Sequence, residues 1–279
     1  MKVVALHPLM ADLARQVGGQ HVEVVSLMGP NDDPHHFNPT PAALHKARGA
    51  KVYLASGMGL ETYLGKLRDT LGEAATVVEV GKTLPAREVG AAFVCTQEGH
   101  DHEGHDHGST IDPHWWHRVS NMQRAADVVA KAFSLADAGH AADYKANARR
   151  YRAELSRLNS WVRRTLMVVP KTDRKLATAH ASFGYFCDEY GFESMAVKGI
   201  NKGGQPSAKV LAEIVKTIRE QQIKAVFPEQ RANPKALKTL AKETGVRIGG
   251  TLIADGSDSY AGMIRHNVNT ILKALAPGK

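Results

Sequence analysis

One tripeptide occurs twice in this chain, and its residue types could bind a metal. Asp-Pro-His stands at residues 33–35 and again at 112–114. A third histidine, His180, lies in the segment AHASFGYF, and a carboxylate, Asp255, lies in LIADGSDSY. Imidazole nitrogens and carboxylate oxygens are common ligands of divalent transition metals. If folding brings the tripeptide histidines together with His180 and Asp255, the chain holds a metal site.

The candidate ligand set consists of three imidazoles and one carboxylate. This composition suits tetrahedral Zn²⁺, whereas the harder Mn²⁺ is better served by carboxylates and carbonyl oxygens. The order of affinities alone would also admit Cu²⁺ or Ni²⁺. Four protein ligands would close the site, and catalytic zinc usually keeps a position for water, so binding is favoured over catalysis. The candidate ligands are His35, His114, His180 and Asp255.

A histidine-rich tract precedes the second tripeptide. Residues 81–112 show no periodic pattern, and loops of this length are mostly functional or disordered. Their centre, HDHEGHDHG at 100–108, cannot form a packed core and matches a flexible metal-collecting segment. The alternative is a hydrophilic insertion without a role. The residues predicted to recruit metal are His100, His102, His105 and His107.

Polar neighbours of the candidate ligands have competing interpretations. His36 or His117 could replace the histidine of its own tripeptide. Glu229 could accept a hydrogen bond that orients a ligating imidazole, or it could be a surface acid. Asp258 could substitute for Asp255 or cap the last helix. No nucleophile, HExxH or Walker-type motif accompanies these residues.

The first part of the chain alternates apolar β-branched runs with short amphipathic stretches. This alternation predicts a lobe with a parallel sheet, in which ligands bind beyond the carboxyl ends of the strands. His35 would lie just past such an end. We expect strands over 2–7, 22–27, 52–55 and 76–80, and helices over 9–17, 41–48 and 60–71.

The pattern repeats in the last part of the chain, after a helix over 121–136 and a longer one over 140–167. The longer helix would extend about 40 Å, enough to tie two lobes together, and it stops before Pro170. His180 and Asp255 both follow predicted strands. We expect strands over 175–178, 193–197, 225–227 and 246–249, and helices over 182–190, 207–221, 234–244 and 259–275.

These elements predict an α/β protein with two Rossmann-like lobes joined by a long rigid linker helix. The metal site would lie in the cleft between the lobes. The predicted N-terminal lobe spans 1–136, with the histidine-rich loop at 96–111. The predicted linker spans 137–169, and the C-terminal lobe spans 170–279.

Composition excludes several classes of protein. The 279 residues are 43% hydrophobic and 23% charged, as expected of a globular protein that needs no disulfide framework. Cys95 and Cys187 lack CxxC spacing, so they are either unpaired thiols or one long-range bridge. The net charge of +8 is spread among acids, without the basic run that would indicate nucleic-acid binding. No apolar run is long enough for a membrane span.

Four segments together resemble a known family, the cluster A-I solute-binding proteins of metal ABC importers, of the ZnuA/TroA type. The resemblance implies two α/β lobes joined by one long helix, with Zn²⁺ or Mn²⁺ bound between them and handed to a membrane permease. It places the ligands of that family on His35, His114, His180 and Asp255. The segments are DPHHFNPTP, DPHWW, AHASFGYF and LIADGSDSYAGMIRHNVNTI.

The resemblance also implies zinc as the cargo. Manganese binders of this type tend to carry glutamate at the third position, where this chain has His180, and the histidine-rich loop is typical of zinc-specific members. The expected function is high-affinity capture of Zn²⁺ for an ABC permease, without catalysis. The alternatives are a manganese or broad-specificity binder, and a zinc hydrolase that would need an open coordination position and an acid such as Glu229.

Location and partners are inferred from the same resemblance. Met1 leads directly into a strand without a signal peptide. The chain is therefore either cytoplasmic or a mature exported form with an added initiator Met, and the resemblance favours the second. It implies a periplasmic or lipid-anchored protein, and no lipobox cysteine is present to favour the anchor. We expect a monomer that serves the permease, with a periplasmic metallochaperone as a further candidate partner.

Overall fold

Strands and helices alternate along the chain, as the sequence predicts. The computed structural model describes the chain except for residues 30–31, 73–74, 90–109, 197–206, 231–233 and 277–279. It divides into two units, each built on a parallel sheet. Unit 1 contains Met1–Ala86, Arg118–Ser160 and Asp255–Ile264, and unit 2 contains Arg87–His117, Trp161–Ala254 and Arg265–Lys279. The sequence predicts each lobe and the linker as one continuous stretch, at 1–136, 137–169 and 170–279. These boundaries remain a prediction.

Unit 1 is organised around four parallel strands in the order β2-β1-β3-β4. They are β1 (Lys2–Ala5), β2 (Glu23–Ser26), β3 (Val52–Ala55) and β4 (Thr76–Glu79). The central strands β1 and β3 are almost continuous apolar runs, because both faces of the sheet are covered by helices. Strand β2 lies on one side of β1, and β3 lies on the other side. The direction in which the chain adds strands therefore reverses between β1 and β3.

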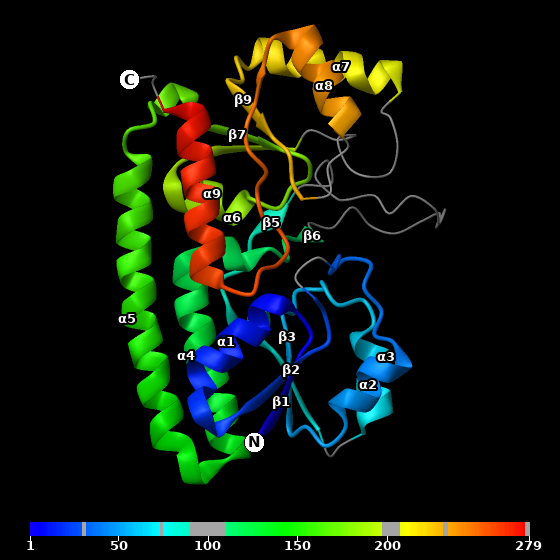
Figure 1. Cartoon of the computed structure of the whole chain (residues 1–279), viewed down its shortest axis with the longest axis vertical. Helices are drawn as coiled ribbons and strands as arrows, with labels where there is room; N and C mark the ends of the chain where they lie inside the picture. Colours follow the sequence, from blue (N-terminus) through cyan, green and yellow to red (C-terminus); the bar gives the residue numbers. More distant parts are fainter. Residues whose placement is uncertain (30–31, 73–74, 90–109, 197–206, 231–233, 277–279) are drawn as a thin grey trace. The chain divides into compact units, whose positions relative to one another are not determined.

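Two pairs of helices cover the two faces of this sheet (Figure 1). Helices α2 (Pro41–Ala47) and α3 (Leu64–Leu71) pack on one face. Helices α1 (Pro8–Gly18) and α4 (Val119–Ala136) contact each other and the central strands. The buried cluster beneath α2 and α3 consists of Val4, Leu6, Leu27, Ala47, Ala50, Tyr53, Ala55, Tyr63, Leu64 and Leu67.

Unit 2 repeats this winding. Its parallel strands have the order β10-β9-β7-β8, so β7 takes the place that β1 has in unit 1. The strands are β7 (Lys175–Thr178), β8 (Glu193–Ala196), β9 (Ala225–Phe227) and β10 (Arg247–Ile248). Its helices include α6 (Gly184–Tyr190), α7 (Ala208–Glu220) and α8 (Pro234–Thr244). Ile214 and Ile218 of α7 and Leu240 of α8 pack on β7 and β9.

Two helices contribute residues to both units. The long helix α5 (Ala141–Leu166) belongs to unit 1 as far as Ser160, and α9 (Tyr260–Leu275) belongs to unit 1 as far as Ile264. The predicted long helix at 140–167 is therefore present with nearly the predicted ends. Within the described parts of the chain, no helix is both long and apolar enough to cross a membrane.

The segment predicted to be irregular, 81–112, contains a small antiparallel sheet at its ends. Strand β5 (Glu88–Val89) pairs with β6 (Thr110–Ile111), so this part of the prediction was wrong. Strands of two residues are too short to produce a recognisable alternation of apolar and polar side chains. The histidines at 100–107, which the sequence predicts to recruit metal, and Cys95 lie outside the described residues.

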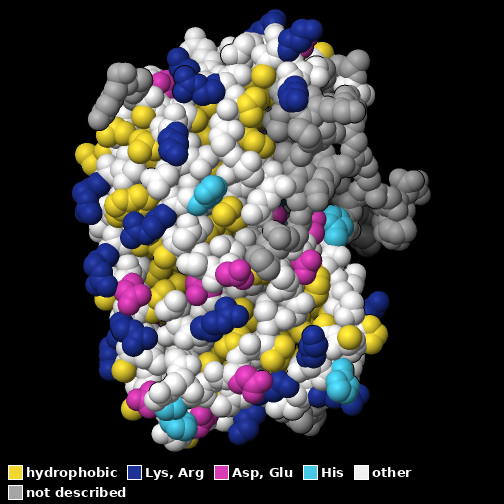
Figure 2. All heavy atoms as spheres, viewed as in Figure 1, with side chains coloured by type: hydrophobic (Ala, Val, Ile, Leu, Met, Phe, Trp, Pro, Cys, Tyr) yellow, Lys and Arg dark blue, Asp and Glu magenta, His cyan; other side chains and the backbone are white. Residues whose placement is uncertain are grey.

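The surface and the described cysteine agree with an ordinary globular protein. On the face that Figure 2 shows, Lys and Arg side chains are interspersed with acidic and apolar ones and form no single basic field. Cys187 is buried without a disulfide in the described structure, and burial raises the pKa of its thiol to about 12. This thiol is therefore protonated and unreactive at neutral pH.

Two glycines, one inside α3 and one directly after its last residue, should respond in opposite ways to the same substitution. A β-carbon added at Gly65 or Gly72 would meet no other described atom within 4 Å. Gly72 ends the helix at φ 64° and ψ −166°, a conformation that is essentially restricted to glycine. Gly72→Ala should lower the free energy of unfolding by ~1–3 kcal/mol. Gly65→Ala should raise it by up to about 1 kcal/mol, because alanine loses less entropy in a helix.

Urea unfolding followed by circular dichroism measures both changes. Gly65→Ala is the matched control, since it adds the same methyl group to the same helix. Equal destabilisation by both substitutions would show that the effect of Gly72→Ala does not come from the backbone conformation of Gly72.

Candidate metal centre

The candidate ligands lie past the carboxyl ends of strands in both units. His35 follows β2 in unit 1, and His180 follows β7 in unit 2. Glu229 follows β9, which lies beside β7 where the winding of the second sheet reverses. The reversal point is where open α/β sheets bind ligands, since the loops on its two sides diverge there.

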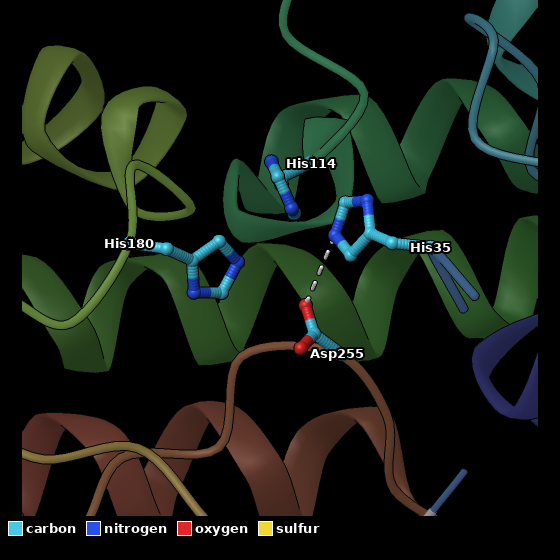
Figure 3. A group of neighbouring side chains, drawn as sticks. All are labelled: His35, His114, His180 and Asp255. Carbon is cyan, nitrogen blue, oxygen red and sulfur yellow. Dashed lines mark ion pairs between the residues drawn. The ribbon is translucent and has the colours of Figure 1, made fainter. Parts of the chain in front are cut away.

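His35 and Asp255 form a pair within unit 1. The His35 Nε2 atom lies 4.0 Å from the Asp255 Oδ1 atom, and Figure 3 shows the ring and the carboxylate facing each other. Both side chains are partly exposed, at 28% and 20%. Asp33 fixes the turn that carries His35, because its Oδ1 accepts a hydrogen bond from the His35 backbone N–H at 3.1 Å. The pair can offer one nitrogen and one carboxylate oxygen to a metal.

His36 has a different environment from its neighbour. Its side chain is 68% exposed, and its Nδ1 lies 3.2 Å from the Asp33 Oδ2. The carboxylate of Asp33 thus contacts both histidines of the turn, the first through its backbone and the second through its ring. The His36 ring therefore contacts the carboxylate that fixes the turn.

His114 and His180 form the second pair, within unit 2. Their ring centroids are 5.2 Å apart with an interplanar angle of 67°, an edge-to-face arrangement (Figure 3). His114 is buried and His180 is partly buried. Each ring is held by a carboxylate on its Nδ1 side, Asp112 for His114 and Glu229 for His180.

Asp112 fixes the orientation of His114. Its Oδ1 lies 2.8 Å from the His114 Nδ1 and accepts the His114 backbone N–H at 3.0 Å. Burial raises the pKa of Asp112, and the hydrogen bond from His114 and the charge of Arg87 oppose this rise. With Asp112 ionised, as its contact with Arg87 favours, the carboxylate only accepts hydrogen bonds and the Nδ1 of His114 carries the proton. The Nε2 lone pair is then available to a metal, which is the arrangement that zinc-ligating histidines usually have.

Asp112 is itself held by residues from other parts of unit 2. Arg87 Nη1 lies 3.4 Å from the Asp112 Oδ2, and the Tyr185 hydroxyl donates to the Asp112 carbonyl at 3.2 Å. The backbone N–H of Arg87 donates to the same hydroxyl at 2.8 Å. The sequence analysis noted the repeated Asp-Pro-His, but it did not predict that the aspartate of the second tripeptide orients the histidine ring. Knowledge that carboxylates orient ligating imidazoles could have suggested this role.

Glu229 performs the corresponding task for His180. Its Oε2 accepts from the His180 Nδ1, and its Oε1 accepts from the His180 backbone N–H at 3.2 Å. The Glu229 side chain is only 9% exposed, which rules out the surface-acid alternative. The Thr178 hydroxyl donates to the His180 carbonyl at 2.7 Å, so the ring and the backbone of His180 are both fixed.

Two alternatives from the sequence take structural places instead. His117 is fully buried, and its Nε2 bonds to the Ala254 carbonyl at 2.9 Å, which also accepts from Trp116 Nε1 at 2.9 Å. His117 therefore fixes the residue before Asp255. For Asp258 the sequence left two roles open, and the capping role belongs to Ser259, whose Oγ accepts the N–H of Gly262 at 3.2 Å.

One buried histidine was missed by the sequence analysis. His7 follows β1, and its Nδ1 accepts the backbone N–H of Leu9 at 3.2 Å as the cap of α1. Burial lowers the pKa of His7 to about 4, and Asp255 acts against this shift through its charge and its backbone. The signal that could have identified the cap is the proline that follows, since proline is favoured at the first position of a helix.

Comparison with known proteins supports a metal-transport role. The family model described as "ZnuA: Zinc-uptake complex component A periplasmic" matches residues 3–274. The chain is 35% identical over 290 aligned positions to the manganese-binding lipoprotein MntA of Bacillus subtilis, covering 99% of this chain and 90% of that protein. It is 29% identical to the iron-binding protein YfeA of Yersinia pestis, covering 98% of this chain and 86% of that protein.

A solved structure agrees with the fold over its whole length. The periplasmic zinc-binding protein TroA from Treponema pallidum superimposes with a TM-score of 0.82 at 28% identity, covering 99% of both chains. The names of these relatives include manganese, iron and zinc binders. All are metal-binding proteins and none is an enzyme, so the matches support binding of a divalent metal without identifying it.

The contact between Glu229 and His180 predicts a measurable effect on metal affinity. Glu229→Gln replaces a charged hydrogen-bond acceptor by a neutral one, which weakens the hydrogen bond that orients the His180 ring. We expect the affinity for divalent metal to fall about 10- to 100-fold, the usual cost of losing such an outer partner. Competition with a chromophoric chelator measures this change.

Glu213→Gln provides the control, because Glu213 is an exposed acid on α7 of the same unit. It removes the same charge without touching the candidate ligands. Equal affinities of Glu229→Gln and the unaltered protein would show that Glu229 does not support the site.

Proposed function

We propose that this chain, which belongs to the ZnuA family of metal-binding components of ABC transporters, captures Zn²⁺ and delivers it to a membrane permease. As a member of that family it is a solute-binding protein and not an enzyme. The family membership accounts for binding of a divalent metal. The identity of the metal and its ligands are our proposal.

The proposed ligands are the two residue pairs described above, acting on one ion. Each of the four side chains offers one ligand atom. The observation that carries the proposal is the orientation of His114 and His180, whose Nδ1 atoms are both occupied by buried carboxylates. These contacts leave Nε2 as the metal-binding nitrogen of each ring. His35 and Asp255 would complete a tetrahedral set of three nitrogens and one oxygen.

The donor set favours zinc over manganese. Zn²⁺ is readily bound by imidazole in a tetrahedral arrangement, whereas Mn²⁺ prefers oxygen ligands and higher coordination. His180 is the decisive residue, because a carboxylate there would give two nitrogens and two oxygens. The names of the relatives do not decide between the metals, since they include manganese, iron and zinc. A manganese or broad-specificity binder is therefore the alternative.

Competition between the two metals tests the choice of cargo. Metal-free protein is offered equimolar Zn²⁺ and Mn²⁺, and the bound metal is measured by elemental analysis after gel filtration. We expect zinc in a one-to-one complex and almost no manganese, because three imidazoles favour the softer ion. Preferential retention of manganese would overturn the zinc assignment while leaving a metal-transport role intact.

The proposed ligands and the histidine-rich loop should differ in their effect on binding. His114→Ala should weaken zinc by more than the 10- to 100-fold that is typical of an outer partner, because it removes a ligand. Deletion of residues 100–107 should leave the equilibrium affinity nearly unchanged and slow the capture of zinc from dilute solution. Chelator competition gives the affinities, and stopped-flow fluorescence gives the capture rates.

These two variants together test the proposed division of roles. If loop deletion lowers the equilibrium affinity as much as His114→Ala does, the loop is part of the principal site. If His114→Ala binds zinc as tightly as the unaltered protein, His114 is not a ligand.

Location and partners follow from the same proposal. We place the protein outside the cytoplasm, in the periplasm, in keeping with the description of the family and with a relative that is a lipoprotein. Helix α5, which contributes residues to both units, would serve as the long rigid linker. We further propose a monomer whose main partner is the permease, with a periplasmic metallochaperone as a second candidate.

A further inference from the structure

The four residues before Asp255, at 251–254, are held along their whole backbone. They belong to unit 2, and each of them is hydrogen-bonded to another part of that unit. Leu252 forms a parallel bridge with Glu229, and its N–H donates to the Pro228 carbonyl at 2.8 Å. Side chains hold the other three residues of this segment.

Asn267 holds the third residue of the segment, Ile253. It lies on the part of α9 that belongs to unit 2, and it is only 1% exposed. Its Oδ1 accepts the Ile253 N–H at 2.8 Å, and its Nδ2 donates to the Ile253 carbonyl at 2.8 Å. One side-chain amide therefore satisfies both polar backbone groups of one residue, as a paired strand would do.

The residue before Asn267 holds the start of the segment. The Nε2 atom of His266 lies 2.8 Å from the Thr251 carbonyl oxygen. Two consecutive residues of α9 thus bind the backbone at residues 251 and 253. The helix therefore replaces a neighbouring strand along this stretch.

The carbonyl of Ala254, directly before Asp255, accepts two hydrogen bonds. Trp116 Nε1 and His117 Nε2 each lie 2.9 Å from this oxygen, and both residues are fully buried. Because a carbonyl oxygen only accepts, Nε2 carries the proton of the His117 ring. The peptide unit that joins Ala254 to Asp255 is planar, so these two donors also fix the direction in which the Asp255 backbone starts.

We propose that Asn267 is a positioning residue for metal binding, which holds the backbone before Asp255 so that its carboxylate is in place when the ion arrives. A backbone that is ordered in advance spares the bound state the entropy cost of ordering it. Asn267 does not touch the metal, and its effect passes through Ile253 to Asp255. This inference rests on the proposed function, because it assumes that Asp255 is a ligand.

Asn267→Leu tests this role, because it replaces the amide by an apolar group of similar size. Both polar backbone groups of Ile253 then lose their partner, and the segment before Asp255 is less firmly held. We expect about a tenfold loss of zinc affinity, typical of an outer partner, measured by chelator competition.

Thr244→Val is the matched control in the same unit. The Thr244 hydroxyl donates to the Leu240 carbonyl at 2.6 Å and accepts the Val246 N–H at 3.1 Å, so it too bonds two backbone groups. Its loss should lower the melting temperature of the metal-free protein without changing the zinc affinity. An equal loss of zinc affinity in both variants would reduce the role of Asn267 to general stability and overturn the inference.

The absorption spectrum of bound Co²⁺ reports directly on the ligands. Co²⁺ is offered in place of Zn²⁺ at saturating concentration, and its visible bands depend on the number and geometry of the atoms that bind it. We expect altered bands in Asn267→Leu and unaltered bands in Thr244→Val. Bands of Asn267→Leu identical to those of the unaltered protein would show that Asp255 is correctly placed without Asn267.

A double-mutant cycle with Asp255→Ala shows whether the effect passes through that carboxylate. If it does, the double variant binds zinc no more weakly than Asp255→Ala alone. Additive losses would overturn the inference and leave the proposed ligands in place. Unchanged zinc affinity of Asp255→Ala would overturn the proposed ligand set and, with it, this inference.

Two variants of His117 test the same backbone if Asn267→Leu fails to fold. His117→Phe keeps an aromatic ring beside Phe183 and removes the donor to the Ala254 carbonyl, whereas His117→Gln offers an amide N–H in its place. We expect weaker zinc binding for His117→Phe and recovery for His117→Gln. Equal zinc affinities of the two variants would contradict control of Asp255 by the backbone before it.

Discussion

A metal-binding imidazole must present one nitrogen without its proton, and in this chain buried carboxylates impose that condition. Asp112 and Glu229 each accept from the Nδ1 of a histidine and from a backbone N–H of the same residue. Ring and main chain are therefore fixed by one side chain. A rotating imidazole would lose entropy on binding the ion, and a wrong tautomer would offer a proton in place of a lone pair. Arg87 and Tyr185 in turn keep Asp112 in place.

The elements of the fold could be predicted from sequence because local pattern and tertiary structure agree. Buried parallel strands are continuous apolar runs, and the helices between them begin at proline or end at glycine, as α2 and α3 do. The two-residue strands β5 and β6 could not be predicted, because their pairing depends on contacts between distant positions. Each unit consists of three separate segments of the chain, and the order of predicted strands and helices likewise does not show this.

The candidate site could be predicted only in part. Residue type and position after a strand singled out His35 and His180 as candidates, and the repeated tripeptide drew attention to His114. The functions of Asp112 and His7 depend on which atoms they face, and no spacing in the sequence encodes that. His117 illustrates the limit of position alone, since its place beside a candidate ligand left metal binding open as an alternative, whereas its ring bonds to the Ala254 carbonyl. Family resemblance selected among these histidines, but it did not explain their orientation.

The two sheets share one order of strands, but the side chains at their equivalent strand ends differ. At equivalent strand ends, one sheet places a histidine against a proline-initiated helix, and the other places it before a turn that leads into a shorter helix. The early helix start leaves His7 fully buried, whereas His180 before the delayed start is partly buried. A shift of a few residues in where a helix begins can therefore decide whether a strand-end histidine becomes part of the scaffold or part of the binding surface.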